Sequence, residues 1–178
     1  IDGAWAAELA FDQTPVSSLI GQGDALAALS QAWDSATLAA GAEAVGVMQA
    51  LMRDTLNYTS QRKQFGQPLA AFQALQHRMA DMYMQVEQAR SMMYLATSAC
   101  LQSDARARRE AVSGAKVMVG QAARKVGQEA IQLHGGMGMT DELDVSHCFK
   151  RLLAFELRMG NTDEHLAHCR ALGRAQAA

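Results

Sequence analysis

Two stretches of the sequence have residue types suited to an anionic ligand with a flat ring. Residues 62–66 read Arg-Lys-Gln-Phe-Gly, and residues 132–138 read Gln-Leu-His-Gly-Gly-Met-Gly. The planar guanidinium of Arg62 suits a phosphate, and the ring of Phe65 suits a flat partner. The glycines of the second stretch would let a ligand approach backbone N–H groups closely. Taken alone, each stretch also has an ordinary explanation, as cations near a helix C-terminus or as a glycine-terminated helix.

The elements that must hold these stretches are helices. Apolar residues repeat every three and four positions in two long segments, as in the seam of a helix bundle. The first seam comprises Phe72, Leu75, Met79, Met82, Val86, Ala89 and Met93, and the second comprises Val112, Ala115, Val119, Ala122 and Val126. An earlier stripe begins with Leu26, Leu29 and Trp33, after Asp24 as an N-cap.

Two further helices follow the glycine stretch. Thr140 is a suitable cap for a fourth helix whose buried face carries Val145, Phe149 and Leu152. Residues 161–164 resemble a capping box that opens a last short helix ending near Gly173. We therefore predict an all-α fold, an antiparallel four-helix up-and-down bundle with an extra short C-terminal helix and a strand-like N-terminal arm.

The first 23 residues differ from the rest of the chain. Residues 7–12 alternate polar and apolar types as a short strand does, and glycines and a proline follow them. A single strand has no partner of its own, so the segment is either a docked or disordered arm or the last strand of a preceding β domain. We expect residues 1–23 to be a remnant of such a domain, residues 24–178 to form the bundle, and the chain to be a piece of a larger protein.

Composition excludes several classes of function. A net charge of −2 gives no bulk electrostatic case for binding nucleic acid or an anionic membrane. Three scattered cysteines without a Cys-x-x-Cys pair favour a reduced, cytoplasmic protein. We expect no membrane span and no metal site, because the apolar runs are short and the histidines lack the Glu-x-x-His pattern of bundle metal centres.

Together with Phe72 and Gln73, the two stretches resemble the C-terminal helical domain of acyl-CoA dehydrogenases, and the resemblance covers nearly the whole chain from Asp24. It implies a flavoenzyme that contains FAD and desaturates an acyl-CoA thioester between its α and β carbons. A carboxylate base would remove the α proton while hydride passes to the flavin. The implied partners are acyl-CoA, electron-transfer flavoprotein as acceptor, and further subunits in a homo-dimer, a homo-tetramer or a heteromer.

The resemblance also implies which residues contact the ADP portion of FAD. These are Arg62, Gln64, Phe65, Gln73, Gln132, Gly135 and Gly136. We expect the 178 residues alone to be inactive, because the domains that would complete the flavin pocket precede this one in the family.

The catalytic base departs from the family pattern. Most members carry a Glu where this chain has Met159, and a thioether cannot take up a proton. Other members place the Glu on the first long helix, where Ala36 stands here. Glu43, two turns further along that helix, is either a solvated residue or a weak candidate for a displaced base. Asp163 and Glu164 are weaker candidates still, because a capping role explains them.

Two alternatives remain open from the sequence. Residues 42–46 and 149–152 look most like small or partner subunits of heteromeric dehydrogenases. The chain would then be a structural partner that lacks its own base, with or without flavin. The other alternative is an unrelated helical bundle whose motifs arose by chance.

Overall fold

The computed structural model describes residues 1–18 and 25–177, with the side chains of the last helix described as far as Arg174. Five α-helices, two 3-10 helices and a two-stranded hairpin make up these ranges. Their bounds are α1 Ala25–Gln61, β1 Lys63–Gln64, β2 Gln67–Pro68, η1 Leu69–Ala71, α2 Gln73–Cys100, α3 Ala105–His134, η2 Gly135–Met139, α4 Asp144–Leu157 and α5 Thr162–Ala177. The prediction of an all-α fold is confirmed.

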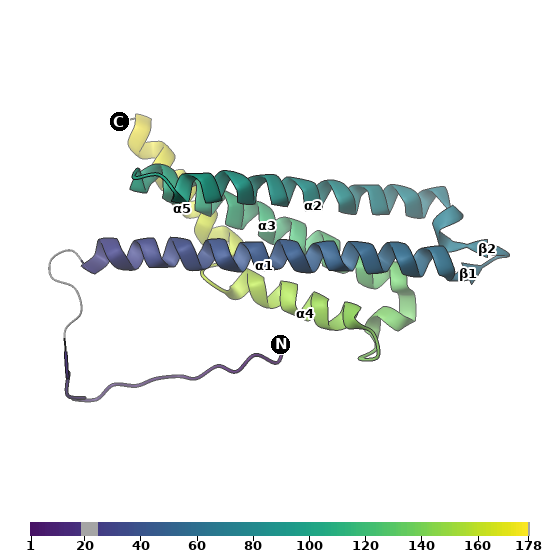
Figure 1. Cartoon of the computed structure of the whole chain (residues 1–178), viewed down its shortest axis with the longest axis horizontal. Coiled ribbons are helices and arrows are strands. Elements are labelled where there is room, and N and C mark those ends of the chain that lie inside the picture. The colour runs from purple at the N-terminus through teal and green to yellow at the C-terminus, as the bar shows by residue number, and fades with distance from the viewer. Residues whose placement is uncertain (19–24, 178) are drawn as a thin grey trace.

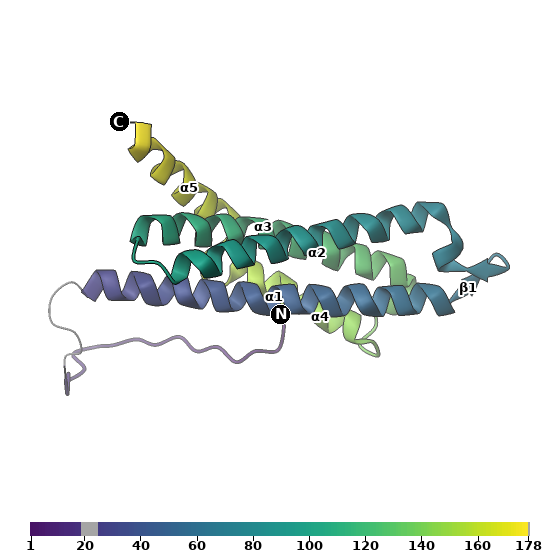
Figure 2. The same cartoon turned by 45° about the horizontal axis from the view of Figure 1, so that its top comes forward.

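The three longest helices lie side by side and reverse direction at each connection (Figure 1). The hairpin joins α1 to α2 at one end of the bundle, and η2 joins α3 to α4 at that same end. Helix α4 packs against α1 and α3 as the fourth member of the bundle. Helix α5 packs on α3 and then diverges from the bundle axis (Figure 2). The two motif-bearing connections therefore meet at one end of the molecule.

The core lies between α1, α2 and α3 and follows the two predicted seams. Met79, Met82, Val86, Ala89 and Met93 are buried on α2, and Val112, Ala115, Val119, Ala122 and Val126 are buried on α3. Helix α1 contributes Met48 and Leu51, both fully buried. Burial of each such side chain stabilises the fold by about 1.5–3 kcal/mol before entropy is counted. The bundle thus provides a rigid frame for its connections.

Buried polar contacts that were not predicted from the sequence also join the helices. Asp34 on α1 accepts a 2.9 Å hydrogen bond from Arg108 on α3, and both side chains are buried. Lys116 on α3 donates to the carbonyl of Phe155 at 2.8 Å, at the C-terminal end of α4, and its ammonium lies 3.9 Å from the Phe155 ring centroid. These contacts fix α1 and α4 against α3.

The predicted core role of the first stripe on α1 is wrong. Leu26, Leu29 and Trp33 have exposed fractions of 76%, 65% and 55%. The buried face of this part of α1 instead passes through Asp34 and Thr37. Apolar spacing shows that a helix has an apolar face, but not that a neighbour in the described chain covers it. The predicted N-cap Asp24 lies outside the described residues.

The predicted strand at residues 7–12 is also not present. The described arm, residues 1–18, has no regular secondary structure, and Trp5 and Phe11 are exposed. A strand without a hydrogen-bonding neighbour has nothing to hold it extended. The arm is tied to the bundle near its start, where Asp2 pairs with Arg151 of α4 at 2.5 Å.

The start of α4 and the end of α5 differ from prediction. Helix α4 begins at Asp144, and Thr140 instead ends η2, with its hydroxyl donating to the Met137 carbonyl at 2.9 Å. Helix α5 continues to Ala177 rather than ending near Gly173, and Gly173 has open space around its Cα. The capping box is confirmed, because Asn161 and Glu164 exchange backbone-to-side-chain hydrogen bonds of 2.7 and 2.9 Å.

Candidate functional site

A hollow of about 510 Å³ lies between the hairpin end of α1 and the glycine loop. The structure brings residues from both predicted motifs into its wall. They are Arg62, Gln64, Gln132, Gly135 and Gly136. Residues 62–64 and 132–136 are far apart in the sequence, so their meeting depends on the parallel course of α1 and α3, whose C-terminal ends lie at the same end of the bundle.

The hairpin that carries Arg62 turns on two residues with positive φ. Phe65 has φ +53° and Gly66 has φ +81°, which is the pattern of the tight turns favoured in two-residue hairpins. A left-handed conformation costs a residue with a side chain roughly 1–2 kcal/mol. Phe65 adopts it with a ring that is 91% exposed and meets Phe72 edge-on at 6.2 Å between centroids.

The glycine loop uses its glycines for two different purposes. Gly135 ends α3 with φ +60°, and neither it nor Gly136 has any atom within 4 Å of where a Cβ would stand. A Cβ on Gly138, in contrast, would lie 2.7 Å from the backbone oxygen of Ile131. Gly135 and Gly136 thus leave the backbone open to a ligand, whereas Gly138 is required for packing.

His134 anchors the loop, a role that the sequence did not predict. Its buried ring stacks on Tyr58 of α1, with centroids 4.4 Å apart. Its Nδ1 donates to the Ala130 carbonyl at 2.8 Å, because a carbonyl oxygen can only accept. The position of His134 inside the loop motif is the signal that could have suggested this role.

The hollow offers positive charge that is not fully neutralised. Within the described ranges, Arg62 pairs with no carboxylate. Arg78 also lines the hollow but donates to Glu129 at 2.6 Å. Burial alone would raise the pKa of Glu129, but the hydrogen bond from Arg78 and the charges of Arg78 and Lys125 lower it below its usual value. Arg62 is therefore the guanidinium best placed to meet an anion.

Two predicted residues stand apart from the wall of the hollow. Phe65 lies at the exposed tip of the hairpin, and Gln73 is exposed at the first position of α2. Any contact between these residues and a flavin would reach them from outside the hollow.

The turn between α4 and α5 holds Met159, at the position where the resemblance implies a carboxylate base. Met159 has φ +57° and Gly160 has φ +88°. The Met159 carbonyl accepts a 2.8 Å hydrogen bond from Nε2 of His165, and Glu156 accepts a 2.9 Å bond from the Thr162 N–H. Hydrogen bonds thus hold the backbone of this turn, but the Met159 side chain has no group that can accept a proton.

The histidine pattern leads us to expect that His165 and His168 cap or solvate the C-terminal helix. Instead, His165 is 4% exposed and bonds to Ser113 of α3 as well as to Met159. Burial lowers the pKa of His165, with the charges of Lys116 and His168 acting in the same direction. Met159 is six residues from His165 in the sequence, but Ser113 is 52 residues away, so the contact with Ser113 could not be predicted from local pattern.

The carboxylates considered as displaced bases have structural partners. Glu43 pairs with Arg151 at 2.5 Å and with Arg158 at 3.3 Å. The hydrogen bond from Arg151 is the main cause that lowers the pKa of Glu43, so the group is a weaker base than usual. Glu164 belongs to the capping box, and Asp163 is exposed in the first turn of α5.

The bundle thus carries the glycine loop and the basic hairpin at one end, as the resemblance to acyl-CoA dehydrogenases implies. The family model described as "Acyl-CoA dehydrogenase, C-terminal domain" matches residues 26–173. The chain belongs to the acyl-CoA dehydrogenase family.

Three relatives illustrate the similarity. The short-chain specific acyl-CoA dehydrogenase of Megasphaera elsdenii is 30% identical over 162 residues, which cover 89% of this chain and 42% of that protein. Butyryl-CoA dehydrogenase from the same organism superposes with a TM-score of 0.79 at 27% identity, over 89% of this chain and 40% of the other. A variant of the Tcur3481-Tcur3483 steroid ACAD gives 0.81 at 28% identity, over 85% and 41%. The chain thus spans about two fifths of the length of these relatives.

Proposed function

We propose that this chain is the C-terminal, FAD-contacting and oligomerising domain of a flavin-dependent acyl-CoA dehydrogenase. Its reaction would be the α,β-desaturation of an acyl-CoA thioester. The observation that carries the proposal is the hollow in which Arg62 and Gln64 meet Gln132, Gly135 and Gly136. Family membership supports the same class of oxidoreductase.

The residues of the hollow fit the ADP portion of FAD. Arg62, which pairs with no carboxylate among the described residues, offers its guanidinium for a phosphate, and the open backbone at Gly135 and Gly136 gives room for close approach of an anion. Gln64 and Gln132 add amide groups that both donate and accept. When bound, FAD supplies the acceptor for the hydride that leaves the β carbon. This chain's part is to bind and orient the cofactor's ADP end.

The proposal also covers the domains, the oligomeric state, the electron acceptor and the location of the whole protein. Residues 1–23 would belong to a preceding β domain, and residues 24–178 would form the bundle. The oligomer would be a homo-dimer, a homo-tetramer or a heteromer, with electron-transfer flavoprotein as acceptor. Among the described helices, none is long and apolar enough to cross a bilayer. A cytoplasmic location stays a prediction from the cysteine content.

Met159 favours a second candidate function. A chain that keeps the cofactor-binding motifs but has a thioether at the base position could serve as the partner subunit of a heteromeric dehydrogenase. The solved relative named for two proteins, the Tcur3481-Tcur3483 steroid ACAD, agrees with an assembly of unlike chains and with a steroid-like acyl group.

Replacement of Arg62 tests the proposed cofactor site. A hydrogen bond to a charged group contributes about 1.5–3 kcal/mol, so Arg62→Ala in the full-length protein should weaken FAD binding about 10- to 100-fold. Arg53→Ala is the matched control, because Arg53 lies on α1, which ends just before Arg62, and its 70% exposed side chain pairs with the adjacent Asp54. Equal FAD affinity in wild type and Arg62→Ala would refute the assigned role of the hollow.

Anaerobic titration of the full-length protein with acyl-CoAs separates the two candidate functions. Loss of the flavin absorbance band in the protein alone would support an active dehydrogenase with a displaced base. A flavin band that persists until a partner chain is added would support the partner subunit.

A further inference from the structure

The turn at residues 158–160 holds a strained backbone that its surroundings must maintain. Three non-glycine residues in the described ranges have positive φ, namely Gln13, Phe65 and Met159. Gln13 lies in the exposed arm and Phe65 at a hairpin tip, but Met159 lies between two packed helices. Such a conformation costs roughly 1–3 kcal/mol and persists where neighbouring contacts over-determine it, often at a functional site.

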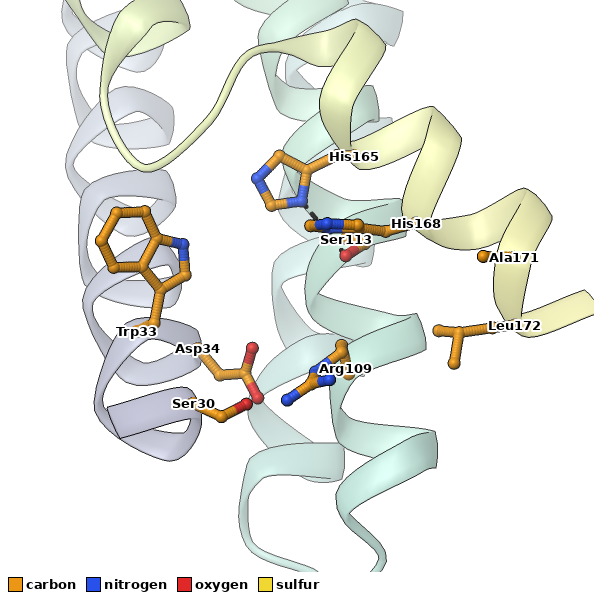
Figure 3. Close-up of a pocket in the computed structure, with 9 residues that line it drawn as sticks. All are labelled: Ser30, Trp33, Asp34, Arg109, Ser113, His165, His168, Ala171 and Leu172. Carbon is orange, nitrogen blue, oxygen red and sulfur yellow. Dashed lines mark hydrogen bonds between the residues drawn. The ribbon is translucent and has the colours of Figure 1, made fainter. Parts of the chain in front are cut away.

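His165 supplies the contact that reaches the strained residue itself. Its Nε2 lies 2.8 Å from the Met159 carbonyl oxygen and must donate, because that oxygen can only accept. In the neutral ring, Nδ1 is then an acceptor, so the hydroxyl of Ser113 donates to it at 3.1 Å. Figure 3 shows the ring of His165 on α5 directed toward Ser113 of α3. The Met159 carbonyl thereby requires the tautomer that carries the proton on Nε2, and Ser113 satisfies and orients the other ring nitrogen.

Packing around the ring leaves little freedom for the turn. His165 is 4% exposed and Ser113 is 2% exposed. A Cβ on Gly160 would lie 3.1 Å from Nε2 of His165, so the imidazole also sits against the backbone of Gly160. The other anchors, Glu156 on Thr162 and the capping box at residues 161–164, fix the start of α5 rather than Met159.

We propose that His165 is a positioning residue, oriented by Ser113, that sets the backbone at Met159 for the reaction of the assembled dehydrogenase. The assignment rests on the proposed function for its last step, that this turn faces the reacting thioester. The chain has lost the carboxylate at this position but keeps a costly turn geometry with a dedicated buried partner. A carboxylate restored there should therefore be presented productively.

Variants of the full-length protein test this assignment in two ways. His165→Ala removes both hydrogen bonds, whereas His165→Gln keeps an amide donor and an acceptor. His168→Ala is the matched control, because His168 is an exposed histidine on the same helix. Its ring approaches that of His165 edge-on, with centroids 5.7 Å apart. Ser113→Ala is a milder second variant that leaves the imidazole in place.

The first measurement is hydrogen–deuterium exchange of peptides that cover residues 158–161. His165→Ala should raise exchange there about tenfold, as expected for the loss of one net hydrogen bond, while α1 and α2 keep their protection. Ser113→Ala should raise it by a smaller factor, His165→Gln should restore it, and His168→Ala should leave it unchanged. Unchanged exchange at the turn in His165→Ala and Ser113→Ala, or an equal rise throughout the bundle, would overturn the positioning role.

The second measurement is turnover of acyl-CoA in a Met159→Glu background. Adding His165→Ala should lower kcat about tenfold or more with little change in KM, and adding His165→Gln should recover most of it. Equal kcat in Met159→Glu with and without His165→Ala would overturn the proposal. Flavin content of the wild type reports separately on the proposed function, since its absence would refute that function while the exchange result still decides the role of His165.

Discussion

The two connections at the ends of α3 and α4 have opposite characters. At the glycine loop, Gly135 and Gly136 leave open space beside a hollow of about 510 Å³, and Arg62 in its wall has no carboxylate partner in the described part of the chain. At the turn of residues 158–160, His165 holds the Met159 carbonyl and Glu156 holds the Thr162 N–H, yet Met159 provides no group for proton transfer. Under the proposed function, cofactor binding and proton abstraction would therefore be separate properties of one bundle.

The largest expected effect comes from the buried ion pair that joins α1 to α3, the helix that carries the glycine loop. Asp34→Ala leaves the buried Arg108 guanidinium unpaired, which should destabilise the fold by about 3–5 kcal/mol. Urea denaturation of the full-length protein measures this change. Asp54→Ala is the control, because Asp54 lies on the same helix in an exposed pair with Arg53 and should change stability by less than about 1 kcal/mol. A small effect of Asp34→Ala would show that α1 and α3 do not depend on this pair.

A pair of glycine substitutions sharpens the description of the loop. Gly138→Ala places a Cβ 2.7 Å from the Ile131 carbonyl oxygen and should destabilise the protein by about 1–3 kcal/mol. Gly136→Leu enters open space and should leave the melting temperature nearly unchanged while FAD affinity falls. Thermal denaturation and flavin titration of both variants measure these effects. Wild-type FAD affinity in Gly136→Leu would contradict a ligand at Gly136.

The turn should respond to pH through His165. Burial lowers its folded-state pKa below the usual 6.5, so the unfolded chain binds a proton at a higher pH than the folded chain does. The free energy of unfolding should consequently fall as pH drops below about 6.5, and this loss should continue down to the folded-state pKa. Comparison of wild type with His165→Gln across pH 5–7, measured by urea denaturation, isolates the contribution. An identical pH slope in both proteins would rule out His165 as its source.

The smallest expected effect concerns Glu43. Glu43→Gln breaks the pairs with Arg151 and Arg158, which are partly exposed, so stability should change by less than about 1 kcal/mol. If the chain is an active dehydrogenase by itself, its turnover should also persist in this variant, because the carboxylate is engaged by two guanidinium groups. A large fall in kcat without a fall in stability would instead identify Glu43 as the displaced base.

The helix seams could be predicted from the sequence because they depend on the local spacing of apolar residues. The seams around Met82 and Val119 were visible because helical periodicity is a property of neighbouring residues. Trp33 was misjudged because its burial depends on what lies opposite, which no spacing reveals. The start of α4 was misplaced because Thr140 and Asp144 both resemble helix beginnings, and the hydrogen bond of Thr140 to Met137 decided between them.

In the candidate site, too, local motifs could be identified from the sequence, whereas roles that depend on distant residues could not. The motifs at Arg62 and at Gly135 were identified from composition and resemblance, and the structure brings them to one hollow. Their binding role stays a prediction. The roles of His134 and His165 escaped notice because they depend on partners such as Tyr58 and Ser113 that are distant in the sequence.

The most direct test of the central claim is the visible absorbance spectrum of the full-length protein, purified in the presence of added FAD. The account predicts a stoichiometric flavin band in the wild type and a much weaker band in Arg62→Ala after gel filtration. A wild-type protein without a flavin band, or an Arg62→Ala variant with an undiminished one, would contradict the assignment of this bundle as an FAD-contacting domain.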